Sequence, residues 1–530
     1  MVTMAVTADK PSRRRGAGPQ PMQASLAGAF SVFMVLAAPA QALEWNFSPS
    51  ISATATFSDN VKQSETNTES GGSFTLRPGF TLQSEGSRRI EANIGYGLSA
   101  VTRFGGSDGD NLYHNLGSSL KAELVEDFFF VDANASVSQQ LLSLFGSPAD
   151  ATTNDSNRAT VGTFSVSPHI KKRLGSFAEA QARYTLGGSI FGDNAASDST
   201  INALSAGLTS GPQFNDLSWG LNYSLREANN RTLADSTFES ATATLGYALT
   251  RKFRVFGTVG EDRNDFISNS GTDGSSYSLG FGWSPTRRTT VEMSAGERFF
   301  GKTFSFNGRH ETRRSRWSVN YAENVSDISA QLAEESQQTY WVCDIGNGLA
   351  GAFSTELNPT PPLDTCLPQP VTPFQLAALG ADLGGLIESG AISISTANGV
   401  FIIKSLNAGV SWTLRRFVFG LTARDTRRFF QLLGNAEDRV QGVTGTVSYR
   451  LTSRTRANGS VSLSRNQADA QLTGTTARND DLMSLSLGLS HRFAEKLNGA
   501  LTFRHTQRDS NDATADYDEN SVSASVSLGF

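Results

Sequence analysis

Apolar and polar residues alternate along most of this chain, and the alternation is plainest in its last twelve residues. Every second position there is apolar, and the positions between carry mainly serine; the apolar set is Val522, Ala524, Val526, Leu528 and Phe530. Side chains of a β-strand point alternately to opposite faces, so this segment predicts a strand with one apolar face. A soluble edge strand shows the same alternation, although so apolar an edge favours aggregation.

The same alternation recurs from Trp45 to Phe530 and favours a membrane-spanning interpretation. We count about 22 segments of roughly 9 to 13 residues, the length of a tilted strand that crosses a bilayer. The clearest segments are 217–225, 241–249, 277–283, 404–414 and 485–489. Strict alternation over so many segments indicates strands, not helices.

Short and long connections alternate between the predicted strands. Short turns are expected near Gly86, Asp127, Gly175, Pro212, Arg251, Pro285, Arg314, Arg415, Ser453 and Glu495, and longer polar loops near Glu65, Asp108, Thr153, Asp193, Asn229, Ser270, Gly301, 326–400, Asn435, Asp469 and Asn511. Outer-membrane barrels have short turns on one side and longer loops on the other. We therefore predict an all-β fold, a transmembrane antiparallel β-barrel of about 22 strands (about 20–24) with short periplasmic turns and long extracellular loops.

The N-terminal segment has the features of a secretory signal peptide. Lys10 and Arg13–Arg15 precede an apolar run from Leu26 to Ala38, and Ala40-Gln41-Ala42 offers a small-x-small cleavage pattern. The predicted domains are thus a signal peptide, 1–42, and an outer-membrane barrel, 43–530. An uncleaved anchor is the alternative, which the short apolar run disfavours.

Charge and composition narrow the function classes. The chain carries a formal net charge of −5 and is 38% hydrophobic, so it has no basic excess for binding nucleic acid. Arginine and lysine nevertheless crowd the short turns, for example at Arg287-Arg288 and Arg313-Arg314. Ordinary solvated turn chemistry explains them, and attraction to anionic phospholipid headgroups is the alternative.

The connection 326–400 is much longer than the others and holds both cysteines of the chain, Cys343 and Cys366. An isolated pair in an oxidising compartment favours a disulfide over a metal site. Such a bond would close a ring of about 24 residues and contribute on the order of 3 kcal/mol. We predict a stapled extracellular loop that folds over the mouth or enters the lumen; an unstructured insertion is the alternative.

The sequence offers no constellation for catalysis, a cofactor or a metal. Its five histidines, His114, His169, His310, His491 and His505, have no metal-ligand spacing and no adjacent nucleophile motif. The inward-facing positions carry small hydroxyl groups with occasional arginines: Ser218, Asn222, Ser224, Ser240, Thr242, Thr244, Thr444, Thr446, Ser448, Arg450, Ser521, Ser523, Ser525 and Ser527. A barrel of this size holds an open channel or one closed by a plug, so we expect a wet, weakly charged lumen.

The start of the predicted barrel resembles a known family. Leu43-Glu44-Trp45-Asn46-Phe47-Ser48-Pro49, followed by Phe57-Ser58-Asp59-Asn60-Val61, is similar to the first strand of outer-membrane barrels associated with the PEP-CTERM/exosortase system. The final strand ending in Phe530 and the overall size agree with that family. The resemblance implies a place in exopolysaccharide and protein-sorting gene clusters, and it supplies no catalytic residues.

These observations lead to one functional expectation and one rival. We expect a porin-like channel in the cell outer membrane, associated with exopolysaccharide or envelope export or with exosortase sorting. The rival is a structural or surface-adhesion barrel with a plugged lumen. Expected partners are outer-membrane lipid, the barrel-assembly machinery, which would recognise the final strand, and polysaccharide-export components; nucleic acid is not expected.

Overall fold

The computed structural model describes residues 44–105, 109–141, 143, 145–146, 157–192, 197–268, 271–331, 340–343, 351–354, 399–434, 436–474 and 476–530. The predicted signal peptide, 1–42, lies outside the described residues. Cys366 also lies outside them, so its bond to Cys343 stays a prediction. Among the described residues, no helix is long and apolar enough to cross a membrane.

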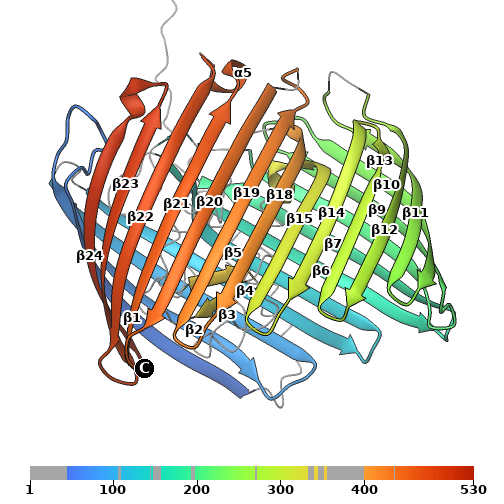
Figure 1. Cartoon of the computed structure of the whole chain (residues 1–530), viewed down its shortest axis with the longest axis horizontal. Helices are drawn as coiled ribbons and strands as arrows, with labels where there is room; N and C mark the ends of the chain where they lie inside the picture. The colour runs from blue at the N-terminus through green and yellow to red at the C-terminus, as the bar shows by residue number, and fades with distance from the viewer. Residues whose placement is uncertain are drawn as a thin grey trace, which may run out of the picture. The chain divides into compact units, whose positions relative to one another are not determined.

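Twenty-two strands form one antiparallel sheet, as the alternation predicted (Figure 1). In chain order they are β1 (Glu44–Ser58), β2 (Gly71–Glu85), β3 (Ile90–Phe104), β4 (Gly109–Val125), β5 (Phe129–Leu141), β6 (Arg158–Leu174), β7 (Ala178–Phe191), β8 (Ser199–Ser210), β9 (Leu217–Asn230), β10 (Ser236–Thr250), β11 (Phe253–Asp265), β12 (Gly274–Thr286), β13 (Thr289–Arg298), β14 (Gly301–Glu311), β15 (Ser315–Asp327), β18 (Val400–Thr413), β19 (Phe417–Phe430), β20 (Ala436–Arg450), β21 (Thr455–Ala468), β22 (Arg478–Arg492), β23 (Leu497–Ser510) and β24 (Tyr517–Gly529). Each strand pairs with its neighbours in the chain, and β15 pairs directly with β18.

The first and last strands close the sheet into a barrel. The ladder between β1 and β24 runs from Ser50 opposite Gly529 to Ser58 opposite Ser521. At its lower end the Phe530 N–H donates to the Pro49 carbonyl at 3.0 Å. Closure leaves no sheet edge, which a membrane-spanning sheet requires because lipid offers no hydrogen-bond partners.

The Asp59-Asn60 turn, which carries much of the family resemblance, has a structural role at the upper end of this seam. The Asp59 carboxylate accepts from the Asn520 backbone N–H at 2.7 Å and from the Asn520 side-chain amide at 2.8 Å. Asn60, almost fully buried, donates to the carbonyls of Ser64 and Asp518 at 2.9 and 2.8 Å. The turn therefore fastens β1 to β24 above the last rung of their ladder.

The outer wall of the barrel is apolar. Large side chains on the outward positions are strongly exposed, with Leu279 at 73%, Val259 at 62% and Leu245 at 58%. Each large aliphatic side chain left in water forgoes roughly 1.5–3 kcal/mol of burial, so a surface covered with them belongs in lipid. The inward positions of the same strands carry Thr244, Thr258 and other polar residues, as alternation requires.

The connections follow the predicted division with one correction. The ten turns at the end of the barrel that carries the C-terminus are short, and the connections at the opposite end are mostly longer (Figure 1). The loop expected near Gly301 is wrong, because only Phe299 and Phe300 separate β13 from β14. The two rings pack edge to face with centroids 5.0 Å apart, which favours so tight a connection.

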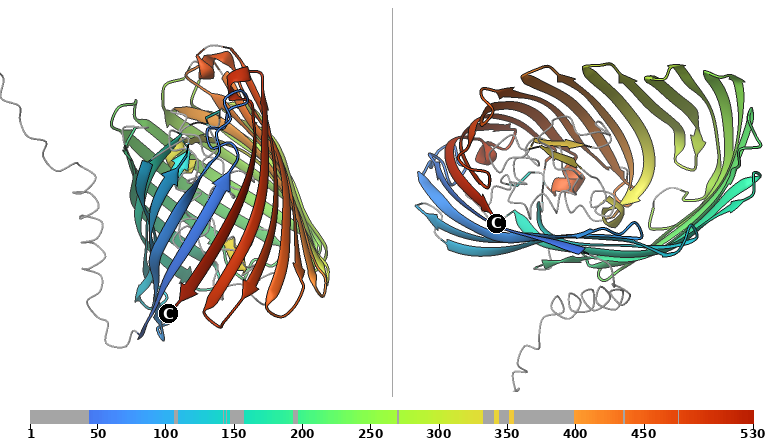
Figure 2. Two further views of the ribbon diagram at one scale, coloured as in Figure 1. Left: turned by 90° about the vertical axis from the view of Figure 1, so that its left-hand side faces the viewer. Right: turned by 90° about the horizontal axis from the view of Figure 1, so that it is seen from below.

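Part of the long connection after β15 lies inside the ring of strands. Its described portion includes a two-stranded hairpin, β16 (Tyr340–Cys343) and β17 (Gly351–Ser354). Views across and along the barrel both place this hairpin in the space that the barrel strands enclose (Figures 1 and 2). Residues 332–339, 344–350 and 355–398 lie outside the described residues, so the predicted arrangement of the connection as a whole stays a prediction.

Deleting Phe530 is expected to lower the amount of folded protein in the outer membrane. The deletion removes the N–H that bonds Pro49 and an aromatic side chain that is 60% exposed on the outer wall. The measurement is the heat-modifiable band in outer-membrane fractions, with the aromatic replacement Phe530→Trp as the control. Equal levels of the deleted and parent chains would show that assembly does not use this residue.

Candidate functional site

The middle of the inner wall is lined by hydroxyl groups that bond across neighbouring strands, as the sequence predicted. Four such pairs have short oxygen–oxygen distances: Ser136–Thr163 at 2.5 Å, Ser167–Thr185 at 2.9 Å, Thr244–Thr258 at 3.0 Å and Thr444–Ser462 at 3.1 Å. A fifth pair, Thr56–Ser523 at 2.9 Å, lies nearer the upper end of the β1–β24 seam. Each hydroxyl keeps spare donor or acceptor capacity. This part of the wall therefore offers polar, uncharged contacts to a solute.

The inner wall near the long loops, which we call the outer end of the barrel, differs from the prediction because it carries buried ion pairs. They are Asp262–Arg298 at 2.9 Å, Arg226–Asp327, Arg428–Asp438 at 2.5 Å, and Asp480 with Arg478 at 3.0 Å and with Arg508. The expectation of a weakly charged lumen is thus wrong for the outer end of the barrel. Two more ion pairs lie on inward positions nearer the periplasmic turns, Arg183–Asp132 at 2.7 Å and Arg254–Glu292. Opposite charges largely cancel within each group, so these pairs change the local charge of the wall more than its net charge.

One group of contacts joins opposite parts of the wall through residues 327–331, which we name the lumen bridge. Asp327 is the last residue of β15 and accepts from Arg226 on β9, although five strands separate β9 from β15 in the sheet. Ser329 shares a 2.7 Å hydrogen bond with Ser199 at the start of β8. Ile328 is buried against Val161 and Phe191, on β6 and β7. The bridge therefore fastens the start of the long connection to the far wall.

The other end of the bridge reaches β19. The Gln331 side-chain carbonyl accepts from Arg428 at 3.4 Å, and Arg428 also donates to Asp438 on β20 at 2.9 Å. The Arg428 guanidinium lies 5.4 Å from the ring centre of Phe401, a cation–π geometry. On the other side, Ser236 at the start of β10 donates to Asp327 at 3.4 Å. Contacts of the bridge thus extend from β6 through β10 on one side to β19 on the other, and Arg428 links them to β20.

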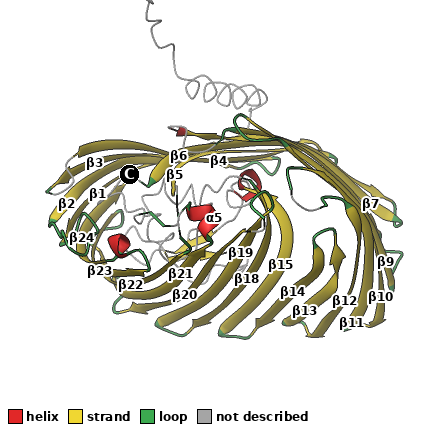
Figure 3. Ribbon diagram, turned by 90° about the horizontal axis from the view of Figure 1, so that it is seen from above, coloured by secondary structure: helices red, strands yellow, loops and turns green. Residues whose placement is uncertain are grey.

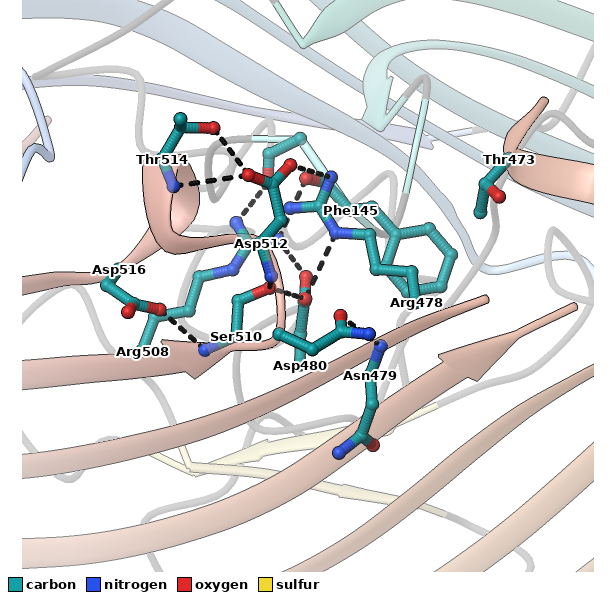
Figure 4. A network of polar contacts seen from close by, with 12 residues as sticks. Phe145, Thr473, Arg478, Asn479, Asp480, Arg508, Ser510, Asp512, Thr514 and Asp516 are labelled. Carbon is teal, nitrogen blue, oxygen red and sulfur yellow. Dashed lines mark hydrogen bonds and ion pairs between the residues drawn. The ribbon is translucent and has the colours of Figure 1, made fainter. Parts of the chain in front are cut away.

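A second group, which we name the outer arginine cluster, consists of Arg478, Asp480 and Arg508 with Phe145 (Figure 4). Arg508 on β23 donates to the backbone carbonyls of Phe145 and Gly146, in the connection between β5 and β6, at 2.8 and 2.7 Å. Arg478 on β22 lies over the Phe145 ring at 5.4 Å. These strands are not neighbours of β5 and β6 in the sheet, so this cluster also joins separate parts of the wall.

Asp480 holds the outer arginine cluster together. Its side chain is 2% exposed, and it accepts from Arg478 at 3.0 Å, from Ser510 at 2.5 Å and from Arg508. Three donors on one buried carboxylate offset the cost of removing its charge from water. Its neighbour Asp481 faces outward, is 42% exposed and pairs with Arg465 alone.

Asp512, in the loop above the outer arginine cluster, adds a dependence on pH. The pKa of its carboxyl is lowered first by hydrogen bonds from the Thr514 hydroxyl and N–H, and then by the nearby Arg478 and Arg508. Because the folded pKa is the lower one, this contribution to stability is present above the unfolded pKa. It is lost as the pH falls through the folded pKa.

The five histidines occupy five different strands and have separate partners. His114 bonds Tyr96 at 2.8 Å, His310 bonds Thr289 at 2.8 Å, His491 bonds Thr455 at 2.9 Å, His505 bonds Asn520 at 2.9 Å, and His169 lies 3.7 Å from Asp132. In the described part of the chain, no three His, Cys, Asp or Glu residues are placed to hold a metal ion.

The closed sheet, apolar outer wall and polar inner wall together define an outer-membrane β-barrel. No family model matches the chain, and no curated protein matches it.

Several solved structures share the barrel fold with this chain. The siderophore receptor PirA from Acinetobacter baumannii is 8% identical with a TM-score of 0.49, over 92% of this chain and 81% of that one. The FrpB iron transporter from Neisseria meningitidis, in its apoprotein form, is 10% identical with a TM-score of 0.48, over 91% and 81%.

Proposed function

We propose that this barrel is a passage for polar solutes across the outer membrane, with an outer mouth narrowed by the lumen bridge and the outer arginine cluster. The observation that carries the proposal is the division of the inner wall. Its middle carries hydroxyl groups that bind water and polar solutes weakly, as a conducting surface must. Its outer end carries buried Asp–Arg groups that join separate strands.

The setting we propose is export of exopolysaccharide or related envelope material. The resemblance of Trp45–Val61 to barrels of the PEP-CTERM/exosortase system supports this setting, together with polysaccharide-export components as partners. Repeated hydroxyl groups on the inner wall suit carbohydrate, because each can exchange a hydrogen bond with a sugar hydroxyl.

Solute uptake into liposomes tests the passage itself. Purified protein in liposomes is expected to let neutral sugars enter, with swelling rates that fall as the sugars grow from monosaccharide to tetrasaccharide. Protein-free liposomes and liposomes with heat-unfolded protein are the controls. Absence of swelling with every sugar, both for the full chain and after removal of the long connection, would contradict the proposal.

One observation favours a second candidate, a structural or adhesion barrel with a filled lumen. The β16–β17 hairpin lies within the wall, and the lumen bridge fixes the start of the same connection. If the whole connection fills the lumen, the barrel would not conduct, and the outer loops would be its working surface.

A further inference from the structure

Five consecutive periplasmic turns carry a concentrated positive charge. They join β10 to β11, β12 to β13, β14 to β15, β18 to β19 and β20 to β21, and together hold nine basic residues and no acidic ones: Arg251, Lys252, Arg287, Arg288, Arg313, Arg314, Arg415, Arg416 and Arg454. Because β15 pairs with β18, these turns are neighbours along the rim (Figure 1). We name this surface the basic arc.

No acidic side chain neutralises the cations of the basic arc within the described part of the chain. All nine side chains are exposed, and none forms an ion pair or side-chain hydrogen bond with another described residue. Neighbouring strands lie about 4.8 Å apart, which places adjacent turns roughly 10 Å from one another. That spacing is close to the Debye length of about 8–10 Å at physiological salt, so the fields of adjacent turns overlap.

A repeated local structure presents these charges. In four of the five turns a threonine hydroxyl accepts the backbone N–H of the basic residue two positions later: Thr250 from Lys252 at 3.2 Å, Thr286 from Arg288 at 3.2 Å, Thr312 from Arg314 at 3.3 Å and Thr452 from Arg454 at 3.1 Å. This side-chain-to-backbone bond stabilises a tight turn and leaves the cation at its tip.

The remaining periplasmic turns lack this surface. The connection between β4 and β5 holds Glu126 and Asp127, and the one between β8 and β9 holds Asp216. Cations near these turns have partners: Arg89 pairs with Glu126 at 2.5 Å, and Lys172 lies 5.7 Å from the Phe128 ring centre. Arg88, in the turn between β2 and β3, is an exposed cation outside the basic arc. The cations without acidic or aromatic partners are therefore concentrated on one side of the rim.

Aromatic residues fix the depth of the basic arc relative to lipid. Trp283 and Trp317 lie within four residues of the arc arginines, face outward, and are 47% and 44% exposed. Trp317 packs edge to face against Trp412, and Phe417 stacks on Tyr449 with centroids 4.2 Å apart. Tryptophan and tyrosine form girdles at membrane–water interfaces. The cations just beyond this girdle therefore lie at the level of the lipid headgroups.

We propose that the basic arc binds anionic phospholipid headgroups of the inner leaflet. Charge complementarity and the adjacent aromatic girdle favour lipid over a soluble anionic partner, since the cations lie against the bilayer. Binding on one side only would concentrate anionic lipid beside β10–β21. This inference is independent of the proposed transport function.

Lipid retention by the folded full-length protein tests the proposal. Detergent-solubilised protein is mixed with dioleoyl phosphatidylglycerol or with dioleoyl phosphatidylcholine, which has the same acyl chains, and bound lipid is counted by native mass spectrometry. The arc variant R287Q/R288Q/R313Q/R314Q is compared with R88Q/K171Q/K172Q/R173Q, which removes four cations elsewhere on the periplasmic side. Heat-modifiable migration identifies the folded fraction of each variant.

The parent and the control variant are expected to retain phosphatidylglycerol in preference to phosphatidylcholine. The arc variant is expected to lose that preference, with retention about tenfold weaker. Equal retention by the arc variant and the parent would overturn the proposal, as would equal losses in both variants. Binding of soluble polyglutamate without any preference for phosphatidylglycerol would also overturn it and would indicate an acidic periplasmic partner.

Discussion

Replacing Asp480 with alanine is expected to destabilise the barrel strongly, whereas the same change at its neighbour Asp481 has little effect. Asp480 is 2% exposed and receives donors from Arg478, Ser510 and Arg508. Its removal leaves two arginines near each other without the carboxylate that neutralises them. Loss of one partner from a buried ion pair typically costs about 3–5 kcal/mol.

Asp481 is a matched control because it has the same side chain, one position later on the same strand. It is 42% exposed and pairs with Arg465, which is 51% exposed. Such exposed pairs contribute about 0–1 kcal/mol, since water screens them. The pair of variants therefore separates burial from residue type, backbone position and net charge.

The measurement is the midpoint of the heat-modifiable gel transition for Asp480→Ala, Asp481→Ala and the parent in one detergent. We expect a much lower midpoint for Asp480→Ala only. Asp480→Asn provides a second comparison, because an amide keeps one acceptor oxygen but not the charge. Midpoints within error of each other for Asp480→Ala and Asp481→Ala would show that the outer arginine cluster does not stabilise the barrel.

The sequence was sufficient for the architecture of the wall because a transmembrane strand obeys a strict period of two. Leu279 and Leu245 face lipid and Thr244 faces inward in the structure, as alternation alone requires. The positions of the turns could also be predicted from the sequence, since polar residues interrupt the alternation there. The exception near Gly301 arose because Phe299 and Phe300 replace the polar residues of a longer loop.

The buried ion pairs could not be predicted in the same way. Asp262 and Arg298 lie on β11 and β13, and Asp327 and Arg226 on β15 and β9. Such partners share no sequence spacing, because their proximity depends on how the closed barrel brings separate strands together. A signal was nevertheless present in the inward position of Arg428 and Arg508, since an arginine facing the lumen near a strand end requires an acidic or carbonyl partner.

The basic arc also could not be recognised from the sequence alone. The paired arginines at Arg287-Arg288 and Arg313-Arg314 were apparent in the sequence, and solvated turns explained them. Only the pairing order of the strands shows that five such turns are consecutive on one side of the rim. The positive charges of single turns therefore combine into one continuous basic surface.

Removing residues 332–398 is expected to increase single-channel conductance in planar bilayers several-fold. The deleted stretch contains the β16–β17 hairpin, which lies inside the ring of strands. Asp327 and Val400 are direct partners in the ladder between β15 and β18, so the ends of the deletion start close together. A short glycine–serine linker from Gln331 to Gly399 can therefore close the gap and keep the lumen bridge.

The control for the deletion is a chain that keeps residues 332–398 but carries Arg226→Ala, which releases the lumen bridge at Asp327. A passage obstructed by the long connection predicts steady large steps for the deletion and smaller, fluctuating steps for Arg226→Ala, because the connection is then loosened but still present. Both variants must show the heat-modifiable migration of a folded barrel. Silence from the folded deletion variant would exclude the passage and favour the structural barrel, since nothing in the removed stretch could then account for the lack of conduction.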